Sequence, residues 1–186
     1  INANRKKYAL KKNDKLIIVG NPPYNDTTSQ YKKGEKGIIL CDDDIKSRDM
    51  GISFLKLFNK LEADYICILH PLSYLIKKQN FNSLGTFSKN YRLLKATIFS
   101  SKEFESIKKG NANFPVIAAC YERNEAGMDY NYIENFKFDI YQNTKIFCLN
   151  DIVTIDGLIP KYPSKKDSTP LQFYTQRDMN SLMRNA

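Results

Sequence analysis

Two stretches in the first half of the chain are made of apolar residues with no regular alternation of polar ones. They span residues 15–20 and 63–71, and each ends in glycine or proline. Short continuous apolar runs are typical of strands buried on both faces of a parallel sheet. Between them, residues 47–61 carry apolar side chains at helical spacing behind Ser47, a residue type that caps helices. The pattern predicts two neighbouring parallel strands, joined by a right-handed crossover through a helix that covers one face of the sheet.

The middle of the chain adds a second helix and two further strands to this picture. Phenylalanine and leucine recur at a spacing of three within residues 73–88, which indicates the helix. Two apolar runs of β type follow at 92–99 and 114–122, and the polar stretch between them lacks a full helical pattern, so they are expected to pair antiparallel. We therefore expect four strands in one sheet, with the last antiparallel to its neighbours: 16–20, 65–69, 93–99 and 114–121.

The last third of the chain has a different pattern. Residues 128–147 alternate aromatic and polar side chains, as a strand or hairpin does, and residues 151–174 are turn-rich, with one glycine and three prolines. The prediction is an α/β protein with a main domain at residues 1–126 and an appended region at residues 127–186.

Composition and charge narrow the class of protein. The chain has 186 residues, with 29 Lys and Arg against 20 Asp and Glu, for a net charge of +9. No apolar run approaches the roughly 20 residues that cross a membrane, and no secretory signal opens the chain, so we expect a cytoplasmic protein without a membrane partner. The cluster Arg5, Lys6, Lys7, Lys11, Lys12 and Lys15 suits the phosphates of a nucleic acid, although a general bias toward lysine produces such clusters too.

Histidine and cysteine are too sparse for the commonest metal and nucleophile chemistries. Cys41, Cys67, Cys120 and Cys148 lie far apart without a Cys-x-x-Cys pair, and His70 is the only histidine. We therefore expect no metal site and reduced, buried thiols. A histidine-assisted nucleophile would have to use His70, at the end of an apolar run, which disfavours this mechanism.

The most informative residues are Asn21, Pro22, Pro23 and Tyr24, which directly follow the first predicted strand. Open α/β sheets bind ligands at the carboxyl ends of their parallel strands. In this tetrapeptide the sequence resembles the S-adenosylmethionine-dependent methyltransferases that modify exocyclic amino groups, whose hallmark is Asn or Asp followed by Pro-Pro and an aromatic residue. The pattern extends over about residues 15–124. A Pro-Pro turn with Tyr24 as a surface aromatic is the alternative.

The resemblance implies a role for each of the four residues in catalysis. The Asn21 side-chain oxygen and the Pro22 carbonyl accept hydrogen bonds from the amino group, and this directs its lone pair toward the methyl donor. Pro22 and Pro23 stiffen the turn. Tyr24 stacks on a base flipped out of the duplex, an interaction worth about 1–3 kcal/mol.

In the family, a second aromatic residue just before the last strand forms the other wall of the base pocket. Phe104 is the first candidate and Phe114 the second, so the expected substrate-binding residues are Tyr24, Phe104 and Phe114. Either phenylalanine could equally belong to the core, and Phe114 heads an apolar run, which favours the core for it.

The chain departs from the family at the cofactor site. Only Ile1–Gly20 precede the motif, and they contain no glycine-rich turn; Gly34 and Gly37 do not follow a strand. We therefore expect a fragment of a Rossmann-like methyltransferase domain that lacks the half binding S-adenosylmethionine. Such a chain would be inactive alone and would associate with the missing half or with another polypeptide through the open edge of its first strand.

The leading hypothesis is the target-side half of an adenine-specific DNA methyltransferase of a restriction-modification system, acting on double-stranded DNA, with residues 127–186 opening a target-recognition region. A methyltransferase for ribosomal RNA or for a protein glutamine shares the tetrapeptide. A non-catalytic nucleic-acid-binding module is a third interpretation, suggested by the positive charge.

Overall fold

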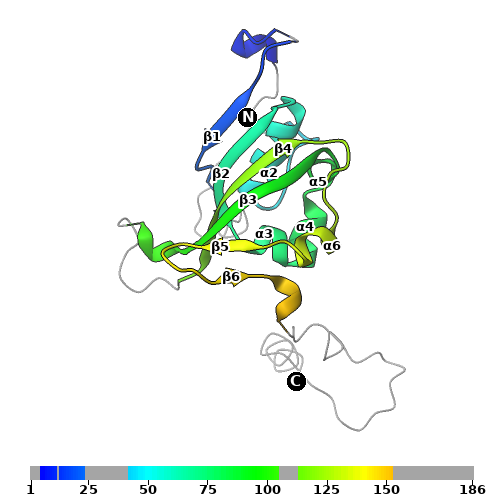
Figure 1. Ribbon diagram of the computed structural model, residues 1–186. Helices are drawn as coiled ribbons and strands as arrows, with labels where there is room; N and C mark the ends of the chain where they lie inside the picture. The colour runs from blue at the N-terminus through cyan, green and yellow to red at the C-terminus, as the bar shows by residue number, and fades with distance from the viewer. Residues whose placement is uncertain (1–4, 12, 24–41, 105–112, 153–186) are drawn as a thin grey trace, which may run out of the picture. The chain divides into compact units, whose positions relative to one another are not determined.

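The computed structural model describes residues 5–11, 13–23, 42–104 and 113–152. The chain divides into two compact units, Ile1–Leu149 and Asn150–Ala186, and the first contains every described strand and α-helix (Figure 1). Residues 127–149 belong to the same unit as the sheet, so this unit extends past the boundary expected at residue 126. That residues 127–186 open a target-recognition region stays a prediction.

The first unit is built on a mixed sheet of six strands in the order β1-β2-β4-β3-β5-β6. The strands are β1 (Ile17–Gly20), β2 (Tyr65–Pro71), β3 (Tyr91–Ser100), β4 (Pro115–Arg123), β5 (Phe138–Ile140) and β6 (Ile146–Phe147). β1 and β2 are parallel neighbours, and β4 lies antiparallel between β2 and β3. The predicted α/β class, the shared sheet of the first four strands and the antiparallel direction of β4 are therefore confirmed.

The α-helices pack on one face of this sheet (Figure 1). They are α2 (Met50–Lys60), α3 (Ser73–Ile76), α4 (Lys78–Ser83), α5 (Thr86–Asn90) and α6 (Tyr130–Glu134), with short 3₁₀ turns η1 (Arg5–Tyr8), η2 (Ser101–Glu103) and η3 (Leu149–Asp151). Ile52 and Leu55 of α2 share one buried core with Ile66 and Ile68 of β2. The prediction that this helix covers one face is confirmed.

The cap of α2 differs from the prediction. The Asp49 side chain, not Ser47, accepts a hydrogen bond from the Gly51 backbone N–H at 2.9 Å. Ser47 instead donates its own N–H to the hydroxyl of Ser53. A carboxylate also interacts favourably with the positive end of the helix dipole, which explains why the helix begins after Asp49.

Two predicted elements are wrong in detail. The single helix expected at 73–88 is three short helices, because Lys77 adopts an extended conformation and Gly85 a φ of +59°. The strand expected from residue 128 begins as helix α6, because Asp129 caps it by accepting from the Tyr132 N–H at 2.7 Å. The hairpin predicted in this region is present later, as the antiparallel pair β5–β6.

Candidate functional site

The carboxyl ends of several strands that are far apart in the sequence lie together at one edge of the sheet. β1, β2, β3 and β5 run in the same direction, so their carboxyl ends, at Gly20, Pro71, Ser100 and Ile140, lie at one edge. Because β4 runs antiparallel, it begins at this edge with Pro115. The edge therefore combines the loop after β1 with the segment that leads into β4.

Asn21, Pro22 and Pro23 directly follow β1 at this edge. Pro22 is buried, whereas Asn21 and Pro23 are exposed. A Cβ added to Gly20 would meet no atom within 4 Å, so the space beside the start of this turn is open. The buried Pro22 ring holds the turn against the protein, and its locked φ restricts the backbone of the turn. The Asn21 side chain faces outward. Tyr24 lies outside the described residues.

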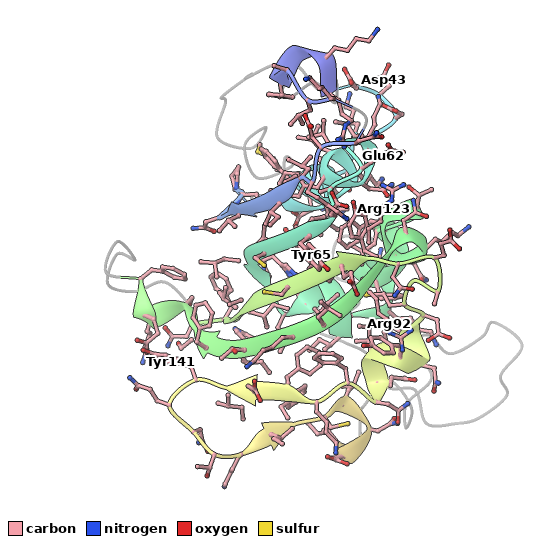
Figure 2. All side chains as sticks on the ribbon, turned by 45° about the horizontal axis from the view of Figure 1, so that its top comes forward. Asp43, Glu62, Tyr65, Arg92, Arg123 and Tyr141 are labelled. Carbon is pink, nitrogen blue, oxygen red and sulfur yellow. The ribbon has the colours of Figure 1, made fainter. Side chains whose placement is uncertain are left out.

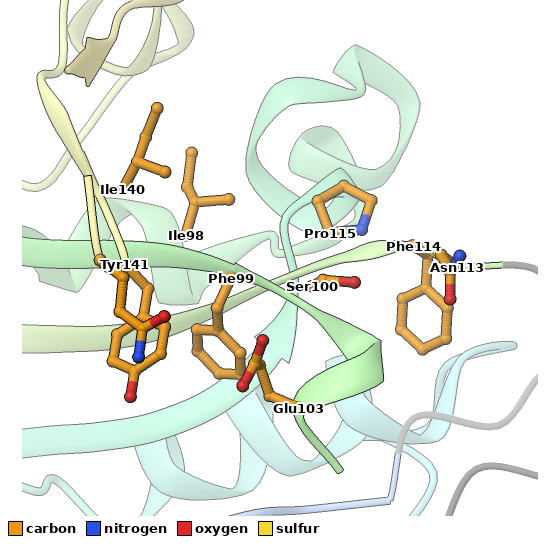
Figure 3. Close-up of a pocket in the computed structure, with 10 residues that line it drawn as sticks. Ile98, Phe99, Ser100, Glu103, Asn113, Phe114, Pro115, Ile140 and Tyr141 are labelled. Carbon is orange, nitrogen blue, oxygen red and sulfur yellow. The ribbon is translucent and has the colours of Figure 1, made fainter.

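Beside the ends of β3 and β5 the same edge is hollowed by a cavity of about 460 Å³. Figure 3 shows the residues around it, which are Ile98, Phe99, Ser100, Glu103, Asn113, Phe114, Pro115, Ile140, Tyr141 and Gln142. Three aromatic rings, two primary amides and one carboxylate therefore surround it. Such a lining suits a flat ring that carries hydrogen-bonding groups, because the rings offer stacking faces and the amides both donate and accept.

The structure separates the two phenylalanines predicted as a pocket wall. Phe114 lines the cavity and is 40% exposed, so it is not the core residue that its sequence position favoured. Phe104 is half-buried and is not among the lining residues; its ring packs against that of Phe99, with centroids 5.8 Å apart. Of the two, Phe114 is therefore the residue that lines the cavity.

The backbone holds Phe114 firmly at the cavity. Its N–H donates to the buried hydroxyl oxygen of Ser101 at 3.1 Å, and its carbonyl accepts from the Ser101 N–H at 3.0 Å. The next carbonyl, of Pro115, accepts from the N–H of Leu72, just after β2, at 3.0 Å. These bonds join the ends of β2 and β3 to the start of β4, so the position of Phe114 is set by the sheet.

Phe99 and Tyr141 were missed by the sequence analysis as cavity residues. Their rings meet edge to face, with centroids 6.5 Å apart. Phe99 reads as an ordinary apolar strand residue, and Tyr141 as part of an aromatic and polar alternation. Only the parallel pairing of β5 with β3 brings Tyr141 to the end of β3, and no local signal in the sequence indicates that pairing.

His70 has a structural place in the core. Its ring stacks between Tyr74 and Tyr121, at centroid distances of 5.3 and 6.0 Å. Nδ1 lies 2.9 Å from the Pro71 carbonyl, which can only accept, so Nδ1 carries the proton and Nε2 accepts from the Tyr121 hydroxyl at 2.7 Å. Burial lowers the pKa of His70 to about 4. A neutral imidazole with both nitrogens engaged does not serve as a general base.

The described part of the basic cluster near the start of the chain lies at the opposite edge from Asn21, because residues 5–11 and 13–15 precede the amino end of β1 (Figure 1). Arg5 donates to the carbonyls of Leu61 and Asp14, at 2.7 and 3.2 Å, and so ties this segment to the end of α2. Lys15 pairs with Asp64 at 3.1 Å. Two members of the cluster thus have structural partners, which weakens the argument from charge for a phosphate contact.

Two searches of the described residues bear on metals and membranes. No group of three or more His, Cys, Asp or Glu side chains among them is arranged to hold a metal ion. No described helix has the length and apolar character to cross a membrane.

The fold and this edge define an α/β protein with a mixed sheet and a hollowed, aromatic-rich carboxyl edge. No protein-family model matches the chain, and a search of curated proteins finds no sequence match. The family and the activity are therefore matters for proposal.

Proposed function

We propose that this chain carries the target-side half of the catalytic domain of an S-adenosylmethionine-dependent, adenine-specific DNA methyltransferase of the restriction-modification type. The observation that carries the proposal is the place of Asn21-Pro22-Pro23, directly after the carboxyl end of a parallel strand. Ligands of open α/β sheets bind at such ends.

The strand order gives independent support. The methyltransferases that the chain resembles continue from the motif through a helix and a second strand to an antiparallel strand pair. In this chain, β1 is followed by α2, by β2 and by the antiparallel pair β3–β4, and β4 is inserted between β2 and β3. A Rossmann-like class is part of this proposal.

In this mechanism the chain's own residues orient the amino group of the target. The amino nitrogen of adenine is a poor nucleophile because its lone pair is delocalised into the ring. Asn21, exposed beside open space, accepts one hydrogen bond from that group through its side-chain oxygen, and Pro22 accepts another through its carbonyl. The buried Pro22 ring keeps both acceptors in a fixed direction, so the enzyme does not reorganise at the moment of reaction.

The cavity supports a base as substrate. Phe114 offers a partly exposed ring at the same edge as Asn21, and Asn113 and Gln142 add donors and acceptors for the edge of a base. Glu103 adds a carboxylate that accepts from an amino group. Stacking of an extruded base on aromatic rings repays part of the cost of unstacking it from the duplex.

The described residues do not fit a complete cofactor site. Their glycines, at positions 20, 51, 85 and 127, lie in separate segments and form no glycine-rich turn between a strand and a helix. S-adenosylmethionine, which supplies the methyl group, would be bound by residues outside the described part. This chain therefore supplies the target side of the reaction.

The test replaces Asn21 by Ala in the full-length protein of which we propose this chain is a part. Loss of an acceptor used in the transition state should lower kcat for methyl transfer from labelled S-adenosylmethionine to duplex DNA by about 100-fold or more, with DNA binding retained. Asn82→Ala, at an exposed position of α4, is the matched control and should retain full activity. Full activity of the Asn21→Ala enzyme would overturn the proposal.

Tyr24 should act on a different step, because we assign it to base stacking. Tyr24→Phe keeps the ring face and should retain most of the activity, whereas Tyr24→Leu should weaken binding of the flipped base. Fluorescence of 2-aminopurine at the target position, which rises when the base leaves the stack, measures this retention. Equal retention by the Phe and Leu variants would remove the stacking role. Methyl transfer to RNA or protein but not to DNA would favour the alternative methyltransferases, and nucleic-acid binding without transfer would favour a binding module.

A further inference from the structure

Two cysteines lie directly opposite each other on the face of the sheet away from the α-helices. Cys67 of β2 and Cys120 of β4 are partners in the antiparallel register, so their side chains lie on the same face of the sheet. Opposed residues of an antiparallel pair have Cα atoms about 4.5 or 5.5 Å apart, and a disulfide spans Cα distances of about 4.4–6.8 Å. The register of the two strands thus places two cysteines that are far apart in the sequence at a Cα spacing that a disulfide spans.

Small reagents have access to this pair. Both thiols are free and both residues are partly exposed. Val19 of β1, which is level with Cys67, is 77% exposed, so no described side chain closes the sheet face on that side. Tyr65 precedes Cys67 by two residues on the same face and is also exposed (Figure 2).

We propose that Cys67 and Cys120 form a dithiol site that a low-molecular-weight disulfide, such as oxidised glutathione, oxidises to a cross-strand disulfide. The thiolate of one cysteine attacks a sulfur of the reagent and releases one reagent thiolate, which leaves a mixed disulfide on the protein. The second cysteine loses its proton to solvent, attacks the protein-bound sulfur and releases the other reagent thiolate. Two protein thiols become one disulfide, and one reagent disulfide becomes two thiols.

The charged groups around Cys120 set the pH dependence of this closure. Burial raises the pKa of Cys120 to about 11, while the ammonium of Lys95, its partner in β3, acts in the opposite direction. Lys95 in turn lies 3.7 Å from the carboxylate of Asp139 in β5. Glu122, on the same face of β4, accepts from the Tyr65 hydroxyl. Because the thiolate is the nucleophile, closure should accelerate as the pH rises from 7 to 9.

The disulfide would join two of the central strands of the sheet. The closed loop between positions 67 and 120 contains β3 and the helices α3, α4 and α5. Cross-linking such a loop restricts the unfolded chain, so the oxidised protein should melt at a higher temperature than the reduced one.

The experiment uses the full chain in its native state, incubated with oxidised glutathione, alkylated and digested with trypsin. Cleavage after lysine and arginine places each cysteine on its own peptide: residues 37–46, 61–77, 110–123 and 146–161. The expected product is peptide 61–77 linked to peptide 110–123, lost on reduction with dithiothreitol and accompanied by the higher melting temperature. Linkage that appears only in a urea-denatured sample would overturn the proposal.

Single substitutions supply the controls. Cys67→Ser and Cys120→Ser should each abolish the linked peptide and the increase in melting temperature. Cys148→Ser should retain both, because the Cys148 thiol donates to the Glu134 carbonyl at 3.2 Å, in another part of the unit. Cross-links from Cys148 at a yield equal to that of the 67–120 pair would show unselective oxidation and would also overturn the proposal.

Discussion

His70 is enclosed by aromatic rings, and its environment links stability to pH. A buried imidazole that stays neutral in the folded protein takes up a proton on unfolding at mildly acidic pH. The folded pKa, about 4, lies below the ordinary value of 6.5. The unfolded state therefore binds more protons between these values, and the free energy of unfolding falls as the pH decreases from 6.5 toward 4.

We predict that this one residue accounts for a loss of roughly 3 kcal/mol in the free energy of unfolding between pH 6.5 and 4. His70→Gln removes the titrating group, so its stability should depend less on pH than that of the wild type, although the variant is less stable at pH 7. Urea unfolding at a series of pH values measures both proteins. Parallel pH curves for the two would contradict the assigned environment of His70.

Gly85 and Gly127 are two residues with similar, positive φ angles in different surroundings. Their φ angles are +59° and +58°. A Cβ on Gly127 would lie 2.5 Å from the Lys89 carbonyl oxygen and 2.6 Å from that of Ser88, whereas a Cβ on Gly85 would meet nothing within 4 Å. The backbone of Ser88 and Lys89 lies close to Gly127 because the N–H of the next residue, Met128, donates to the Ser88 carbonyl at 2.7 Å.

At the level of elements, Gly127 thus fixes how α6 joins the end of α5, and the two glycines form a matched pair of substitutions. Gly85→Ala should cost only the strain of a backbone with φ +59° and ψ −122°, a sparsely populated region for L residues, about 1–3 kcal/mol. Gly127→Ala should cost the strain of its own positive φ plus about 1–3 kcal/mol for the clash with backbone atoms that cannot easily move. Urea unfolding at neutral pH compares the two variants, and equal losses would contradict the close approach at Gly127.

Sequence analysis found the elements that have a local sequence pattern. It missed those that depend on a single residue or on pairing with a distant strand. β1 and β2 were predictable because each is a continuous apolar run closed by glycine or proline, and Asn21 was found because its motif adjoins such a run. The breaks in the helix at 73–88 lie at Lys77 and Gly85, and α6 depends on an aspartate cap within an aromatic alternation that also suits a strand. Tyr141 reaches the cavity only through the pairing of β5 with β3. Such long-range pairing leaves no local trace in the sequence.

At the scale of the whole molecule, the main feature is the outer edge of β1, whose backbone hydrogen-bonding groups face no neighbouring strand among the described residues. The apolar side chains Ile17 and Val19 are 62% and 77% exposed. Open strand edges with apolar side chains pair readily with other chains. This arrangement supports the prediction, made from the sequence, that the chain associates with another polypeptide.

We expect the isolated chain to self-associate through β1 and Val19→Lys to reduce that association, because a charge on an edge strand opposes pairing. The folded state should tolerate the change, since the side chain already faces solvent. Leu94→Lys, at a 49%-exposed position of the register irregularity in β3, is the control and should leave association unchanged. Sedimentation velocity over a range of concentrations measures the effect. A wild-type chain that stays monomeric at high concentration would contradict the prediction.

The insertion of β4 between β2 and β3 also determines how the chain behaves while the ribosome makes it. β2 and β3 leave the ribosome before the strand that joins them, so neither can complete its hydrogen bonding until residues 115–123 have been synthesised. Until then the nascent chain exposes the apolar strand Ile66–Ile68 and the start of β3 together, with only β1 available as a partner. Non-local pairing of this kind slows folding and leaves incomplete sheets open to aggregation. A pause in translation at which β3 has left the ribosome and residues 115–123 have not should therefore prolong the state most dependent on chaperones.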